Sequence, residues 1–196
     1  MIPADKALAR LREGNRRFVQ GGFGPTDRPS ADQEPFAIIL GCSDSRVPAE
    51  LIFGQGFGDL FVIRVAGNIV APSQVGSVEF AAERFRTRLA VVLGHTQCGA
   101  IAATLDELRR PQGHESPNLR AIVDRIRPAI EPVLRRHAVK DSPELIEEAT
   151  RANIQASVNH LRHGSALLEG RIERDGLLIV GAEYRVDEGT VEFLEG

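Results

Sequence analysis

Short and almost wholly apolar runs recur along this chain, and segments with helical spacing separate them. The runs hold four to six residues each and are rich in β-branched side chains: residues 36–40, 60–65, 89–93 and 177–180. Unbroken apolar runs of this length are typical of strands that are covered on both faces, as in a parallel sheet. Because helical segments lie between them, the pattern predicts an α/β fold with a central, mostly parallel sheet flanked by helices.

Helix signals fall between the runs. Pro48 stands where the first residue of a helix would lie, and it predicts a short helix over residues 49–53. Residues 1–20 alternate charged and apolar positions, which indicates an amphipathic N-terminal helix. Residues 73–86 place four apolar side chains on one stripe, those of Val75, Val78, Ala82 and Phe85.

Two further helices begin with a serine followed by a proline. Ser116 and Ser142 are each in the position of an N-cap, with the proline in the first turn. The helix after Ser142 is expected to end near Gly164, because glycine is the usual terminator. In the helix after Ser116, Pro128 and Pro132 fall inside the apolar pattern, and we expect a kink or a break there.

The two ends of the chain differ from its centre. Residues 21–35 are rich in Gly, Pro, Asp and Ser and indicate a loop, which sets a helical arm (1–20) apart from an α/β core (36–196). We expect the arm to pack on a partner subunit. At the other end, the runs 184–186 and 191–194 flank a turn and predict a C-terminal β-hairpin. The length of 196 residues suits one buried core, so we expect a single domain.

Composition and charge narrow the function. The formal net charge is −3, so no global basic field draws the chain to nucleic acid. The N-terminus lacks the apolar core of a signal peptide, and no stretch is long and apolar enough to span a bilayer. We therefore expect a cytoplasmic protein with neither a membrane nor a nucleic-acid partner. In that compartment thiols stay reduced, and paired cysteines more often mark metal binding or catalysis than a disulfide.

The two cysteines follow two of the apolar runs. Cys42 comes shortly after the first run, and His95 and Cys98 come shortly after the third. In open α/β sheets, ligands gather beyond the carboxyl ends of the strands, so these side chains meet if their strands are close in the sheet. Together they offer two thiolates and one imidazole with one position left over, the set that catalytic zinc takes. The alternative, a disulfide between the two cysteines, has no need of His95.

A nearby carboxylate decides whether such a site is open or closed. Asp44 lies two residues after Cys42, and its carboxylate can reach the metal and fill the fourth position. Alternatively it pairs with Arg46, because arginine holds a carboxylate through two parallel hydrogen bonds and keeps it ionised. Water then takes the fourth position. A surface ion pair without a function is a third interpretation of the same two residues.

At these residues the sequence resembles a known family, the β-class carbonic anhydrases, and within it the plant-like branch. The resemblance rests on Cys-Ser-Asp-Ser-Arg after a strand and on His-x-x-Cys-Gly further along the chain. Further segments of the family's type are residues 11–18, 58–64, 66–68 and 76–81. These segments cover most of the first 110 residues, whereas the C-terminal half is matched mainly by its pattern.

The resemblance implies an activity and a set of roles. One zinc ion per subunit is bound by Cys42, His95 and Cys98, and zinc-bound hydroxide attacks carbon dioxide to give bicarbonate and a proton. Asp44 and Arg46 form a dyad that gates the metal, and Asp44 becomes a fourth ligand only in a closed state. The implied enzyme is a carbonate dehydratase, a zinc hydro-lyase whose partners are carbon dioxide and bicarbonate.

The resemblance also implies a substrate pocket at the interface of a homodimer or a higher homo-oligomer. Gln33 matches a glutamine that hydrogen-bonds substrate, Phe61 matches an apolar wall, and both would serve the partner's zinc. Phe80 stands in place of a pocket tyrosine, and the backbone N–H of Gly99 would bind bicarbonate. Ile39 replaces the tryptophan of the bicarbonate-inhibited branch, so we do not expect that branch's regulatory site here.

Two alternatives use the same ligands. One is hydrolysis of a sulfur analogue such as carbon disulfide, which differs mainly in substrate access. The other is a closed zinc site in which Asp44 ligates permanently and which serves structure or bicarbonate sensing. Arg46 argues against the closed site, because a purely structural site does not need a residue that pulls Asp44 off the metal.

Overall fold

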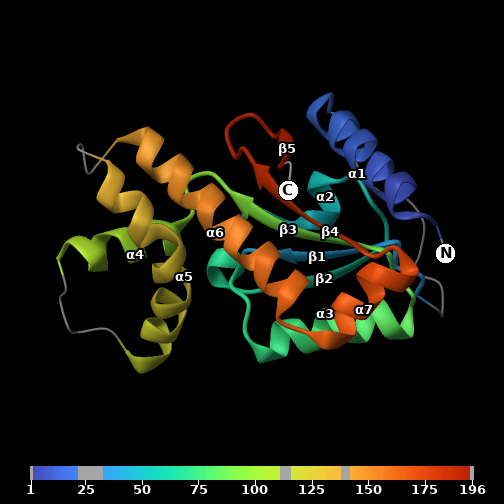
Figure 1. Ribbon diagram of the computed structural model, residues 1–196. Coiled ribbons are helices and arrows are strands. Elements are labelled where there is room, and N and C mark those ends of the chain that lie inside the picture. The colour runs from blue at the N-terminus through green and yellow to red at the C-terminus, as the bar shows by residue number, and fades with distance from the viewer. Residues whose placement is uncertain (1, 22–32, 111–115, 138–141, 195–196) are drawn as a thin grey trace.

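One five-stranded sheet forms the centre of the protein, in a computed structural model that describes residues 2–21, 33–110, 116–137 and 142–194 (Figure 1). Its strand order is β2-β1-β3-β4-β5. The first four strands are parallel, and β5 runs antiparallel to β4, which confirms the predicted mostly parallel sheet. The strands are β1 (Ala37–Gly41), β2 (Leu60–Arg64), β3 (Leu89–His95), β4 (Leu178–Tyr184) and β5 (Val191–Leu194).

Helices cover both faces of the sheet and extend beyond one of its edges (Figure 1). A 3-10 turn, η1 (Ala66–Asn68), follows β2. None of the helices in the described part of the chain is long and apolar enough to cross a membrane. The α-helices are α1 (Ala4–Val19), α2 (Ala49–Ile52), α3 (Pro72–Arg84), α4 (Gly99–Arg109), α5 (Pro117–Arg136), α6 (Pro143–His163) and α7 (Ala166–Asp175).

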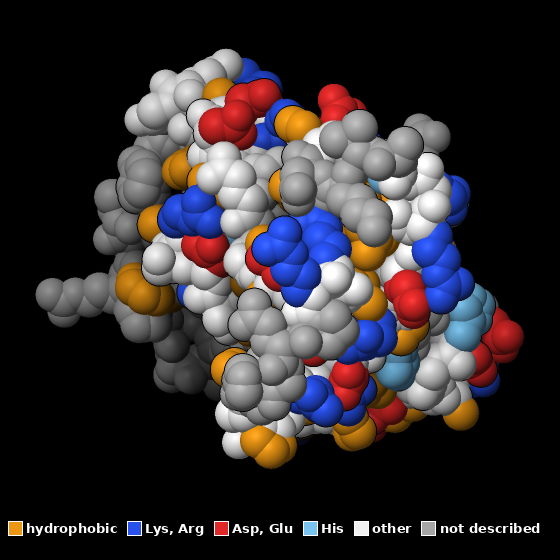
Figure 2. Space-filling view, turned by 90° about the vertical axis from the view of Figure 1, so that its left-hand side faces the viewer, with side chains coloured by type: hydrophobic (Ala, Val, Ile, Leu, Met, Phe, Trp, Pro, Cys, Tyr) orange, Lys and Arg blue, Asp and Glu red, His pale blue; other side chains and the backbone are white. Residues whose placement is uncertain are grey.

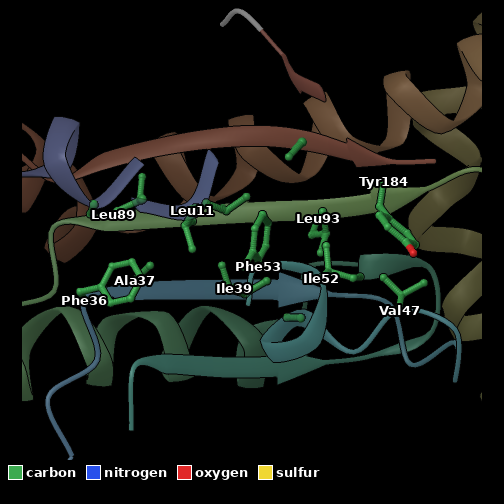
Figure 3. Packing of buried hydrophobic residues seen from close by; sticks show 14 residues of the cluster. Leu11, Phe36, Ala37, Ile39, Val47, Ile52, Phe53, Leu89, Leu93 and Tyr184 are labelled. Carbon is green, nitrogen blue, oxygen red and sulfur yellow. The ribbon is translucent and has the colours of Figure 1, made fainter. Parts of the chain in front are cut away.

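The sheet buries apolar side chains on both of its faces, as the unbroken runs predict. Successive residues of a strand point to opposite faces, so Ile39 belongs to one apolar cluster and Ile38 to another. On the first face α1 and α2 pack through residues such as Leu11 and Ile52, which lie over the strands in Figure 3. On the second face α3, α6 and α7 pack.

A third apolar cluster lies beyond the carboxyl ends of β1 and β3. It is built by α4, α5 and α6 through Ile101, Leu105, Ile126, Ile130, Val133 and Leu145. The same cluster contains Cys42 and Cys98. These three helices therefore cover this edge of the sheet and bury the two thiols.

The predicted helix starts are confirmed, whereas the predicted break in α5 is wrong and a kink there stays a prediction. The side chains of Ser116 and Ser142 accept hydrogen bonds from backbone N–H groups in the first turns of α5 and α6. Helix α6 ends directly before Gly164, as predicted. Helix α5, however, runs without interruption through Pro128 and Pro132. Both prolines lie on the exposed side of the helix, where water can hydrogen-bond the carbonyl groups that they leave without a partner.

The C-terminal hairpin is present, and its first strand is longer than predicted. Strand β4 continues through Gly181 and Glu183 to Tyr184, where we expected a gap after residue 180. Glu183 is fully buried and paired with Arg151 of α6, with Nη2 and Oε2 3.1 Å apart. This pairing allows a charged residue to lie inside the strand. Gly189 supplies the left-handed backbone of the turn, with a φ of 75°.

Helix α1 packs on the chain's own sheet. Its Ala7 and Leu11 are fully buried in the same cluster as β1 and β3. Asn15 donates hydrogen bonds to the carbonyl groups of Ile52, at 3.1 Å, and Gly189, at 2.9 Å. We expected this helix to pack on a partner subunit, but its apolar stripe covers a sheet face that would otherwise lie in water. Contact between its outer side and a second copy stays a prediction.

Candidate metal centre

Three potential metal ligands lie together at the carboxyl edge of the sheet. Cys42 directly follows β1, His95 ends β3, and Cys98 directly precedes α4. Because β1 and β3 are neighbours in the sheet, the loops after them meet. The two sulfur atoms and an imidazole nitrogen all lie within 4.8 Å of one another, and all three residues are buried. Both cysteines are free thiols, so the disulfide alternative is wrong.

The imidazole of His95 is oriented for metal binding. Its Nδ1 lies 2.8 Å from the carbonyl oxygen of Thr96, and because a carbonyl only accepts, Nδ1 carries the hydrogen. Its Nε2 is buried and has no hydrogen-bond partner among the described residues. Such an unpaired buried group costs about 1–3 kcal/mol. A metal ion is the partner that fits, because ligating imidazoles donate their other N–H to a carbonyl and zinc takes this donor set.

Backbone N–H groups converge on both sulfur atoms. Gly67 donates to Sγ of Cys42 at 3.4 Å, and the N–H of Asp44 donates to the same sulfur. Sγ of Cys98 accepts from N–H groups in the first turn of α4. The hydrogen bond from Cys98, together with these donors, lowers the pKa of Cys42. The pKa of Cys98 is raised by its bond to Cys42 and by burial, so a cation between the sulfurs is what allows both to ionise.

Arg46 holds the carboxylate of Asp44 beside the cluster. Nε and Nη2 of Arg46 donate to the two carboxylate oxygens at 3.0 and 2.8 Å, and its backbone N–H adds a bond of 2.9 Å. These hydrogen bonds hold the pKa of Asp44 well below its usual range. Oδ2 of Asp44 remains 3.9 Å from Nε2 of His95. The carboxylate is thus ionised, next to the ligand atoms, and engaged by the arginine through both oxygens.

The same guanidinium also reaches the second ligand loop. Nη1 of Arg46 donates to the side-chain oxygen of Gln97, and Nη2 donates to the Gln97 carbonyl, both at 3.2 Å. Gln97 has a left-handed backbone with a φ of 59°, which is uncommon for a residue other than glycine. Arg46 therefore ties the loop after β1 to the loop after β3. Sequence reasoning missed Gln97, whose one signal was its place between His95 and Cys98.

A second arginine fixes the loop that carries Cys42. Arg64 ends β2, and its Nε donates to the carbonyl of Cys42 at 3.0 Å. Its Nη2 donates to the carbonyl of Asp44 at 2.5 Å. Since β2 pairs with β1 in the sheet, the arginine is anchored beside the loop that it holds. The segment from Cys42 to Asp44 is therefore bound by two arginines.

Three of the expected pocket residues do not join this cluster within the chain. Gln33 precedes β1 and lies beside Gly58, with its Cα 3.8 Å from the place of a Cβ on that glycine. It thus lies at the amino edge of the sheet, whereas Cys42 lies at the carboxyl edge, a strand length of roughly 17 Å away. Phe61 lies near the start of β2, and its ring centroid is 6.1 Å from that of Phe80, which is 54% exposed.

The dyad lies between the buried ligand atoms and the surface. The side-chain exposure rises from 0% for His95 to 19% for Asp44 and 44% for Arg46. Gly99 begins α4, and a Cβ there would meet nothing within 4 Å, so a small ligand has room to approach its backbone. Figure 2 shows the face beyond the carboxyl ends of the strands, where basic and acidic side chains of the described residues are interspersed.

Buried cysteine and histidine side chains that converge at the carboxyl edge of a parallel sheet define an α/β protein with a cluster suited to bind zinc. The carbonic anhydrase family matches residues 37–191. "Carbonic anhydrase 2" of Mycobacterium tuberculosis is 37% identical over 196 residues, which cover 93% of this chain and 89% of that protein. The carbonic anhydrase of Mycolicibacterium smegmatis is 36% identical and covers 95% of this chain and 91% of its own length. This chain belongs to the carbonic anhydrase family.

Solved structures place it in the β class of that family. The β-carbonic anhydrase CcaA matches with a TM-score of 0.76 at 31% identity, covering 96% of this chain and 95% of the other. The β-carbonic anhydrase CafA of Aspergillus fumigatus matches with a TM-score of 0.76 at 27% identity, covering 97% and 90%. Zinc is the cofactor of this class, and the cluster of Cys42, His95 and Cys98 is suited to bind it.

Proposed function

We propose that this protein is a carbonate dehydratase, which interconverts carbon dioxide and water with bicarbonate and a proton. One observation carries the proposal: Cys42, His95 and Cys98 converge, and Asp44 is held beside them by Arg46. Three protein ligands leave a fourth position, which distinguishes a catalytic zinc site from a structural one. Membership of the carbonic anhydrase family supports the same reaction.

Each residue of the centre has a defined task in this reaction. Cys42, His95 and Cys98 hold the zinc ion, which when bound lowers the pKa of water toward neutrality and so supplies a nucleophile. Asp44 accepts a hydrogen bond from the attacking water and thereby aims an oxygen lone pair at carbon dioxide. Arg46 keeps Asp44 ionised and oriented. The proton leaves to solvent past the exposed end of the dyad.

We infer that Asp44 and Arg46 also act as a gate. With both oxygens bonded to Arg46, Asp44 stays off the metal, and water can take the fourth position. Without those bonds, a carboxylate that lies 3.9 Å from Nε2 of His95 would take the position itself and close the site. The hydrogen bonds from Arg46 to Gln97 support the open state, because they hold the guanidinium in place.

We propose that a second copy of the chain completes the substrate pocket. Gln33 and Phe61 lie at the amino edge of the sheet, too far to reach the metal centre of their own chain. Phe80, next to Phe61, is 54% exposed, and Phe57 is 67% exposed, so this edge presents apolar surface that a partner can cover. In the resulting dimer, Gln33 hydrogen-bonds substrate at the partner's zinc and both Phe61 and Phe80 wall the slot. Gly99 of the zinc-bearing chain offers its N–H to bicarbonate.

We place the enzyme in the cytoplasm. Its metal centre needs both thiols in reduced form, and cytosolic thiols stay reduced. The two cysteines lie close enough to each other that an oxidising compartment would put the centre at risk of forming a disulfide. Cell fractionation followed by immunoblotting tests this placement.

Stopped-flow hydration of carbon dioxide, with zinc analysis of the same samples, tests the reaction. We expect one zinc per chain and rapid hydration for the wild type, and loss of both in Cys42→Ser. Glu50→Gln, an exposed change in α2 just after the ligand loop, is the matched control and should keep both. A zinc-loaded wild type that hydrates no carbon dioxide at any pH would refute the reaction, and assays with carbon disulfide would then follow.

Subunit complementation tests the shared pocket. Gln33→Ala and Cys42→Ser chains, each weakly active or inactive alone, are mixed and allowed to exchange subunits. A mixed dimer has one site with an intact metal centre and an intact Gln33 from the other chain, so activity should rise on mixing. If the wild type sediments as a monomer, or if mixing restores nothing although subunits exchange, the shared pocket is wrong.

A further inference from the structure

A tight backbone turn supports the sulfur of Cys42. The turn is η1, which follows β2 after Val65, and its Gly67 and Asn68 both have left-handed backbones, with φ values of 69° and 43°. The N–H of Gly67 donates to Sγ of Cys42 at 3.4 Å. The geometry of this hydrogen bond therefore depends on how firmly η1 is held.

Glycine on its own does not hold the N–H in place. Gly67 has the widest conformational freedom of any residue type, so its N–H can rotate away from the sulfur at little cost. Asn68 is in a conformation that few residues other than glycine adopt, which favours relaxation of the turn. Contacts from elsewhere in the fold must therefore keep η1 in this shape.

Those contacts come from the buried face of helix α6. Nδ2 of Asn153 donates to the carbonyl of Gly67 at 2.9 Å, and Oγ of Ser157 donates to the carbonyl of Asn68 at 3.1 Å. Asn153 and Ser157 are one helical turn apart, so both reach η1 from the same side of the helix. Both are buried, and no competing water weakens the two bonds. The two successive carbonyl groups of the turn are thus clamped from a distant segment.

We propose that Asn153, assisted by Ser157, is a positioning residue of the metal centre. It fixes the backbone on the carbonyl side of Gly67, and so keeps the N–H of that residue directed at the Cys42 thiolate. The proposal rests on the proposed function, because it takes Cys42 to be a zinc ligand. Both side chains act on the ligand through the turn, by binding its carbonyl groups.

This role has a consequence for metal binding and for the electronic state of the sulfur. Residues that orient a ligand from outside the coordination shell change metal affinity by roughly 10–100-fold when they are removed. A hydrogen bond to a thiolate also lowers the energy of its lone pair. Losing that bond should therefore move the sulfur-to-cobalt charge-transfer absorption of the cobalt(II) form to longer wavelength.

The test compares Asn153→Ala and Ser157→Ala with Thr150→Val. Thr150 is also buried on α6, but its hydroxyl bonds to the carbonyl of Ile146 within the helix and not to η1. Zinc affinity is measured by chelator competition, the cobalt(II) absorption is recorded, and the stability of each metal-free protein is measured by urea unfolding. We expect Asn153→Ala to bind zinc about 10–100-fold more weakly with a shifted cobalt band. Thr150→Val should keep the wild-type affinity and band.

The outcomes separate this inference from the proposed function. If Asn153→Ala destabilises the metal-free protein but keeps the zinc affinity and cobalt band of Thr150→Val, the asparagine is merely structural and the inference is wrong. Should Asn153→Ala fail to fold, the smaller change Ser157→Ala decides by the same two readouts. A wild type that binds zinc tightly without hydrating carbon dioxide would overturn the proposed reaction and leave the inference intact.

Discussion

Replacing Gly67 with alanine should damage both the fold and the metal centre. A Cβ at this position would lie 2.8 Å from Cδ1 of Ile126 and 3.0 Å from Cβ of Ala100, and the φ of 69° is unfavourable for any residue with a Cβ. The left-handed backbone costs about 1–2 kcal/mol. Overpacking costs about 1–3 kcal/mol, toward the lower end here because the methyl group of Ile126 can turn aside. The free energy of unfolding should therefore fall by about 2–4 kcal/mol.

Urea unfolding of the metal-free protein, followed by a zinc titration, measures this effect. Gly76→Ala is the matched control: this glycine lies within helix α3, and a Cβ on it would meet nothing within 4 Å. Alanine there should stabilise the protein by about 0.5–1 kcal/mol. Gly67→Ala should in addition weaken zinc binding, since the N–H on the Cys42 sulfur is displaced. Equal unfolding midpoints and equal zinc affinities for the two variants would refute the reasoning.

Three further predictions concern the dyad and a buried carboxylate. Arg46→Ala should retain zinc and lose about 10–100-fold in hydration rate, because Asp44 is released toward the metal; a fully active variant would exclude the gate. Hydration by the wild type should rise with pH across neutrality, since Asp44, with its lowered pKa, is already ionised there and the attacking water is what titrates; a flat stopped-flow profile would contradict this. Burial raises the pKa of Glu183, so the wild type loses stability as pH rises from the usual glutamate pKa through the raised folded value. Glu183→Gln should remove that loss in urea unfolding measured at several pH values. An unchanged pH dependence would show that the Glu183 carboxylate is not the cause of the loss of stability.

Much of the fold could be predicted because its signals are local. Strands β1, β2 and β3 largely coincide with unbroken apolar runs, and the N-cap serines Ser116 and Ser142 indicate where their helices begin. The full length of strand β4 was harder to predict, because a charged residue such as Glu183 normally indicates the end of a strand. Its partner Arg151 is known only from the structure. Helix α5 likewise continues through Pro128, because this proline lies on the exposed side of the helix, where water can replace the backbone hydrogen bond that a proline cannot make. Tertiary context decided each of these cases.

The metal centre likewise combines residues that local sequence patterns predict with residues that only the tertiary structure brings to it. The convergence of Cys42, His95 and Cys98 was predictable because two short motifs each follow a strand, and neighbouring parallel strands end at one edge. The residues that hold the ligands carry no such signal. Gly67 acts through its backbone, and Asn153 reaches it across 86 residues of sequence. Hydrogen bonds of this kind depend on where α6 packs, which no local pattern specifies.

Zinc K-edge X-ray absorption of the purified protein tests the central claim most directly. Coordination by Cys42, Cys98 and His95 predicts two sulfur atoms at about 2.3 Å and two nitrogen or oxygen atoms at about 2.0–2.1 Å, the second being water. Asn153→Ala and Arg46→Ala proteins recorded beside the wild type would show whether the shell stays intact. A zinc shell without sulfur, or one with a single sulfur, would contradict the convergence of residues 42, 95 and 98 on one ion.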